Sequence, residues 1–63
     1  DGERMFEVDD IVQVVKPSMI NTGQKGKVID MSPSEKFFLV KFTDGKSAYF
    51  QESDLKLIKR SSL

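Results

Sequence analysis

Residue types that carry out catalysis are sparse in this chain. It has no histidine and no cysteine, so the usual general base and the thiol nucleophile are both missing. Asp9 and Asp10 are adjacent carboxylates, but in an extended strand their side chains point to opposite faces. Such a pair is poorly placed for acid–base catalysis or for binding a metal ion. The sequence therefore predicts no enzyme, no metal site, no cofactor and no small-molecule substrate.

Lysines and aromatic residues in the middle of the chain could bind a nucleic acid. Lys25, Lys27 and Lys41 would follow the phosphates, while Phe37 or Tyr49 would stack on unpaired bases. Each stacked base contributes about 1–3 kcal/mol, and so few lysines give weak binding that falls as salt rises. RNA is therefore one candidate partner.

The same part of the chain could instead dock a protein. Phe37, Leu39 and Tyr49 supply apolar anchors, and Met19 and Ile20 in the first loop supply an adaptable rim. With ten basic and ten acidic residues the net charge is zero, which gives no long-range attraction for nucleic acid. We therefore expect a protein partner ahead of RNA. In a purely structural interpretation, Leu39 and Tyr49 form a cross-strand pair that stabilises a hairpin.

The length of 63 residues leaves room for one small hydrophobic core. No apolar run approaches the roughly 18 residues of a membrane span, so we expect no membrane insertion. The first residues, Asp1-Gly2-Glu3-Arg4, lack the basic and apolar regions of a signal peptide. The sequence thus predicts an intracellular protein of the cytoplasm, the nucleus or an organelle stroma.

Short runs rich in valine, isoleucine and phenylalanine alternate with turn residues, a pattern typical of all-β proteins. The predicted strands span residues 11–16, 26–31, 37–42, 47–51 and 56–59. A short helical turn at residues 52–55 precedes the last strand. A flat sheet of such strands would expose its edges, whereas closure removes them. The most economical architecture is a five-stranded SH3-like barrel.

The Asp44-Gly45 pair marks a hairpin between the third and fourth predicted strands. A two-residue turn would mix charged and apolar residues on each face of the hairpin. A three-residue loop with Gly45 in the left-handed conformation keeps the apolar residues together, and it pairs Phe38 with Phe50. We predict this second register. The other face then carries a partly exposed cluster of Phe37, Leu39 and Tyr49.

The stretch from residue 8 to residue 15, followed by Gly23-Gln24-Lys25-Gly26-Lys27-Val28, resembles the KOW motif of ribosomal proteins and NusG-type transcription elongation factors. In that family an aspartate precedes two alternating valines, and a glycine pair precedes a lysine and a valine. The matching positions are Asp10, Val12, Val14, Gly23, Gly26, Lys27 and Val28. Asp9 and Pro17 stand where glycines are usual. The resemblance implies an SH3-like barrel and contacts with RNA.

Two other families with SH3-like barrels are similar to parts of the chain. Residues 38–45 look like the strand and turn of Tudor domains, whose aromatic cages hold methylated lysine or arginine. The order of a valine strand, a long loop, a glycine before the second strand and a final Asp54-Leu55 is similar to small photosynthetic subunits. These are the E subunit of photosystem I and the variable chain of ferredoxin:thioredoxin reductase. They imply an accessory docking role without a cofactor.

Together these patterns predict a non-catalytic interaction module. We expect residues 1–8 to form an acidic N-terminal extension, residues 9–60 the barrel and residues 61–63 a C-terminal tail. The module would dock onto a protein or ribonucleoprotein partner through its exposed aromatic and lysine-bearing face. A photosynthetic docking subunit and a Tudor-like reader of methylated side chains remain as alternatives.

Overall fold

The computed structural model describes residues 6–17, 21–34 and 36–61 of the chain. Its strands are β1 (Ile11–Val14), β2 (Lys25–Met31), β3 (Phe37–Phe42), β4 (Ser47–Gln51) and β5 (Leu55–Lys59). A 3-10 turn, η1 (Glu52–Asp54), precedes β5. The predicted all-β class, the five strands and the helical turn before the last strand are confirmed. The predicted bounds of β3 and β4 are also correct, whereas β1 ends two residues earlier than expected.

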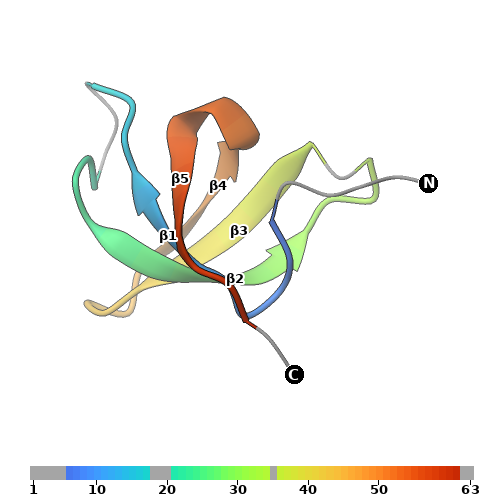
Figure 1. Cartoon of the computed structure of the whole chain (residues 1–63), viewed down its shortest axis with the longest axis horizontal. Coiled ribbons are helices and arrows are strands. Elements are labelled where there is room, and N and C mark those ends of the chain that lie inside the picture. The colour runs from blue at the N-terminus through green and yellow to red at the C-terminus, as the bar shows by residue number, and fades with distance from the viewer. Residues whose placement is uncertain (1–5, 18–20, 35, 62–63) are drawn as a thin grey trace.

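The five strands form one antiparallel sheet in the order β4-β3-β2-β1-β5. Successive strands are neighbours from β1 to β4, and β5 then returns to pair with β1. Figure 1 shows how the sheet bends on itself while η1 carries the chain from β4 to β5. This connection brings the two edge strands toward each other and gives the sheet the shape of a small barrel.

The core lies inside the bent sheet, because a buried residue recurs at every second position in β1 and β3. Nine hydrophobic residues are buried: Phe6, Val12, Val14, Val28, Phe38, Val40, Phe42, Phe50 and Leu55. The aromatic rings meet edge to face, as in Phe42 and Phe50, whose centroids are 5.9 Å apart. Edge-to-face rings and β-branched side chains thus make up the interior.

Phe6 belongs to the segment that the sequence predicts to be an N-terminal extension, yet its side chain is only 3% exposed. Its ring packs edge to face against Phe38, with centroids 5.2 Å apart. Strand alternation could not indicate this position, because Phe6 lies outside every strand and reaches the core through a turn. The packed unit therefore extends back at least to Phe6.

The β3–β4 hairpin adopts the predicted register. Phe38 lies opposite Phe50 and Leu39 lies opposite Tyr49. Gly45 has a φ of 89°, and its N–H donates to the carbonyl oxygen of Phe42 at 3.0 Å. A three-residue loop with a left-handed glycine therefore sets the register, and it keeps the apolar set of β3 inside the barrel.

The pairing of β2 with β3 contains a feature that the sequence does not predict. Val28 lies opposite Val40, but the next pair is Asp30 with Leu39, so the register shifts by one residue at Ile29. Regular alternation would turn Asp30 inward; the shift turns it outward and lets Met31 pack against the core instead. The irregularity therefore removes a charge from the core, while Ile29 keeps the outward position that regular alternation already gives it.

Two glycines near the start of β2, Gly23 and Gly26, have different structural roles. Gly23 has a φ of 87° and lies in the turn before the strand, as expected from its type. Gly26 is inside β2, where an added Cβ would lie 2.6 Å from Val40 Cγ1 and 2.7 Å from the carbonyl oxygen of Lys41. Glycine at position 26 therefore allows β2 to approach β3 closely, and no special backbone angle is involved.

Candidate binding surface

A row of outward-facing residues crosses the sheet from edge to edge. Lys59 lies opposite Ile11, Ile11 opposite Lys27, Lys27 opposite Lys41, and Lys41 opposite Ser47. Since residues directly opposite each other in a sheet point to the same face, all of these side chains lie outside the barrel. We call the outward side of β2, β3 and β4 the outer face.

Two positive charges are neighbours at the centre of this row. Lys27 and Lys41 are direct cross-strand partners and both are exposed. Like charges in such positions destabilise a sheet. Asp9 offsets part of this cost, because its Oδ1 lies 3.8 Å from Lys27 Nζ, but both side chains are more than half exposed. Among the described residues, Lys41 and Lys25 form no salt bridge.

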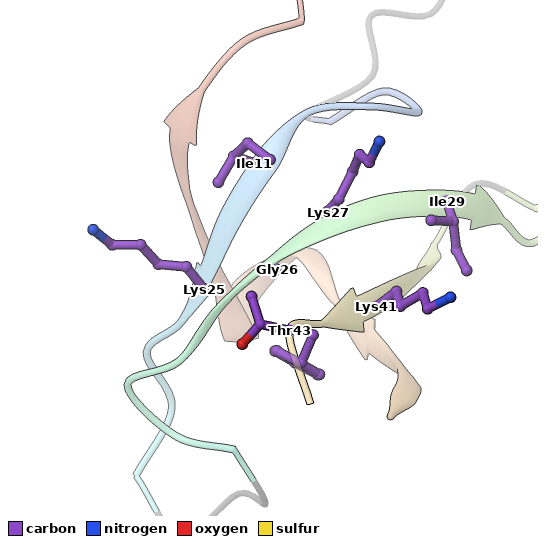
Figure 2. Close-up of a pocket in the computed structure, with 8 residues that line it drawn as sticks. Ile11, Lys25, Gly26, Lys27, Ile29, Lys41 and Thr43 are labelled. Atoms are coloured by element: carbon purple, nitrogen blue, oxygen red, sulfur yellow. The ribbon is translucent and has the colours of Figure 1, made fainter. Parts of the chain in front are cut away.

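These three lysines surround an apolar depression of about 310 Å³, which we call the lysine hollow. Figure 2 shows their side chains pointing in three different directions around it. The lining residues are Ile11, Lys25, Gly26, Lys27, Ile29, Lys41, Phe42 and Thr43. Because Gly26 has no side chain and Ile29 faces outward like Lys27, two residues before it, the hollow has an open floor beside an aliphatic wall.

The predicted aromatic cluster lies on the same outer face. We call Phe37, Leu39 and Tyr49 the aromatic patch; Phe37 is 41% exposed, Tyr49 is 55% exposed, and Leu39 is half-buried. Leu39 and Lys41 are two residues apart on β3 and therefore point the same way. The aromatic patch and the lysine hollow thus form one continuous surface.

The structure brings together six of the eight residues predicted to bind a partner. Lys25, Lys27 and Lys41 surround the hollow, and the aromatic patch adjoins it. Met19 and Ile20, the predicted rim, lie outside the described residues. The sequence did not indicate Ile11 and Ile29. The alternation of β1 could have pointed to Ile11, and that of β2 to Ile29, which lies two residues after Lys27 and faces the same way.

Asp9 and Asp10, the adjacent carboxylates considered above for catalysis, have structural roles. Asp9 is exposed beside Lys27, whereas Asp10 is fully buried, so the adjacent pair does point in opposite directions. Asp10 Oδ2 accepts a hydrogen bond from the Glu7 N–H at 2.9 Å, and Oδ1 accepts one from the Ser61 N–H at 2.7 Å. The Asp10 side chain therefore fastens the two ends of the described chain together.

Asp54 is the second buried carboxylate. Its Oδ2 accepts a hydrogen bond from the Gln51 N–H at 3.1 Å, and Oδ1 lies 3.7 Å from the Nζ of Lys16. This arrangement closes η1 and joins it to Lys16, two residues past the end of β1. In the described part of the chain no group of three or more His, Cys, Asp or Glu side chains could hold a metal ion.

Comparison with protein-family models and with curated protein sequences gives no match. The resemblance to KOW domains therefore stays a prediction. No helix in the described ranges is both long enough and apolar enough to cross a membrane.

Proposed function

We propose that the chain is a non-catalytic interaction module, and that its outer face docks onto a protein or ribonucleoprotein partner. The exposed anchors of that contact are the aromatic patch and the lysines around the hollow. They stand on three adjacent, mutually hydrogen-bonded strands, so a partner would meet a surface whose backbone is already ordered.

The observation that carries this proposal is the pairing of Lys27 with Lys41. The fold gains nothing from two exposed like charges in direct opposition, and neutral residues would fit the same positions. Residues that lower the stability of the fold are expected at functional sites, where binding or catalysis requires them. An anionic group of a partner would turn this unfavourable pair into a favourable contact.

The aromatic patch supports a protein partner in particular. Exposed aromatic residues next to aliphatic ones are typical anchors of protein interfaces, because they bury a large area with few rotatable bonds. Leu39 fills the position between Phe37 and Tyr49 on this surface. The three residues would therefore supply the apolar centre of an interface and the lysines its charged border.

RNA is the second candidate partner. Tyr49 is the diagonal neighbour of Lys41 across the β3–β4 pair, since Lys41 lies opposite Ser47. A base stacked on the Tyr49 ring would place its phosphate within reach of the lysine. Binding of this kind would be strongly weakened by salt, because it depends on the release of counterions.

Site-specific photo-crosslinking tests the proposal. A photoreactive phenylalanine analogue is placed at Tyr49 on the outer face, and in a separate variant at Ile58, an exposed residue of β5 at the opposite edge of the sheet. After irradiation in extract of the source cells, we expect a discrete protein adduct from position 49 and little from position 58. A nuclease-sensitive adduct would support RNA. Equal yields from both positions, or no adduct from position 49, would contradict the proposal.

A further inference from the structure

The chemistry of the lysine hollow suggests the kind of segment that the outer face receives. Resting on the function proposed above, we infer that the hollow binds an acidic segment of a partner protein. One apolar side chain of that segment sits in the hollow, and carboxylates on either side of it meet Lys25, Lys27 and Lys41.

Charge complementarity is the first argument for an acidic segment. Three lysines border an apolar surface that is open to solvent, and their ammonium groups extend away from it in different directions (Figure 2). Only Lys27 has a carboxylate nearby, at 3.8 Å, within the part of the chain that the structure describes. Carboxylates of a partner would bring the missing negative charge to Lys25 and Lys41, and such pairs gain strength when a partner excludes water.

The lining of the hollow indicates an apolar anchor rather than a nucleobase. Its walls are the aliphatic side chains of Ile11 and Ile29, with the methyl-bearing Thr43 at the end of β3. The ring of Phe42 also borders the hollow, but this residue is buried and offers no free face for stacking. A branched or aromatic side chain of a peptide would bury apolar area here, whereas a base would lose its polar edge contacts with water.

Negative charges limit the positive surface to a short segment. Asp9 lies beside Lys27 on one side, and Asp30 lies opposite Leu39 on the other, so both carboxylates border the outer face. A long polyphosphate chain crossing this surface would meet one of them. A short acidic segment with a single anchor fits between them, and this favours a protein occupant over a nucleic acid.

A synthetic peptide of glutamates with one central leucine is the probe. Binding is measured at low salt by amide chemical shifts and by fluorescence anisotropy of the labelled peptide. We expect shifts centred on Ile29, Lys41 and Thr43. Replacing the leucine of the peptide by serine should weaken binding about tenfold, because the hollow would lose most of its apolar contact. Equal affinity of the two peptides, or no binding of either, would overturn the inference.

Variants of the protein test the same assignment from the other side. Lys27→Gln with Lys41→Gln should weaken binding about tenfold or more, whereas the control Lys46→Gln, in the β3–β4 turn, should leave it unchanged. Ile29→Ser should weaken it several-fold, whereas Ile58→Ser should not. The second pair is closely matched, because Ile29 is 38% exposed, Ile58 is 39% exposed, and both lie at register shifts. Thermal unfolding of each variant shows whether it is folded.

A short single-stranded oligouridylate provides the competing outcome. If it binds more tightly than the peptide at the same salt concentration and displaces it, the occupant is a nucleic acid and the inference fails. Failure of the peptide leaves the proposed function open to its own test, because crosslinking from position 49 does not depend on the hollow. Failure of crosslinking from position 49 would contradict the proposed function, whereas intact peptide binding in that case would still support the assignment of the hollow.

Discussion

The inner and outer faces of β2 and β3 belong to the same two strands but follow different rules. On the inner face, Gly26, Val28 and Val40 are buried and in contact, and the size of each residue is set by its neighbours. On the outer face, Lys27 and Lys41 are exposed, opposed and of like charge. The inner face thus shows what the fold requires, and the outer face shows residues whose presence the fold does not explain.

The largest expected effect comes from the inner face. Gly26→Val should lower the free energy of unfolding by about 3 kcal/mol or more, because its Cβ would collide with Val40 and with backbone of β3. Lys27→Val is the matched control, since it adds the same side chain one residue further along, where the space is open. Urea denaturation measures both. A wild-type midpoint for Gly26→Val would show that β2 and β3 can separate at little cost.

The next largest effect is expected at Asp10, whose buried side chain joins the two ends of the described chain. Asp10→Asn should lower the free energy of unfolding by about 2–3 kcal/mol, because an amide cannot accept from both the Glu7 and Ser61 N–H groups and carries no charge. Asp9→Asn, at the exposed neighbouring position, should change it by less than about 0.5 kcal/mol. Denaturation curves and exchange of the Ser61 amide report the change. Similar losses for the two variants would show that burial of Asp10 is unimportant.

A smaller effect is expected on the outer face. Tyr49→Ala should lower the free energy of unfolding by about 0.5–1 kcal/mol through loss of its cross-strand contact with Leu39. Tyr49→Phe, which keeps the ring, should be nearly neutral. Thermal unfolding compares the two. A loss of several kcal/mol for Tyr49→Ala would mean that the fold requires the aromatic patch, as it requires the inner face.

The smallest effect should have the opposite sign. Lys41→Gln should raise the free energy of unfolding by about 0.2–0.5 kcal/mol at low salt, because it removes the repulsion from Lys27. The gain should shrink as salt screens the two charges. Lys46→Gln should give no such gain. Destabilisation by Lys41→Gln at every salt concentration would show that this lysine supports the fold, and the main reason for assigning it to binding would be lost.

Local patterns were enough to predict most of the fold. The alternation of Phe38, Val40 and Phe42 identified β3 and its buried face, and the type of Gly45 indicated the loop that sets the hairpin register. The same alternation predicted that Leu39 and Tyr49 would be neighbours. These features depend on residues close in sequence, so the period of the strand and the geometry of one turn determine them.

The binding surface was predictable only in part. The lysines and aromatic residues stood out by type, but the hollow between the lysines exists only where residues of β1, β2 and β3 meet. The register shift after Val28, which turns the neighbouring Asp30 outward, also has no local signal, because it is set by which side chains the core accepts. The role of Gly26 was also not predictable, because a close approach between strands leaves no local signal.

The sequence by itself determined the all-β class, the number of strands, the hairpin register and the residue types available for binding. Each of these follows from short-range patterns of apolar, polar and glycine residues along one strand or turn. Only the tertiary structure decided that Phe6 joins the core, that Asp10 fastens the chain ends, and that Lys27 opposes Lys41 above an apolar hollow. These contacts join segments that are distant in sequence, and they form only when the closed sheet packs.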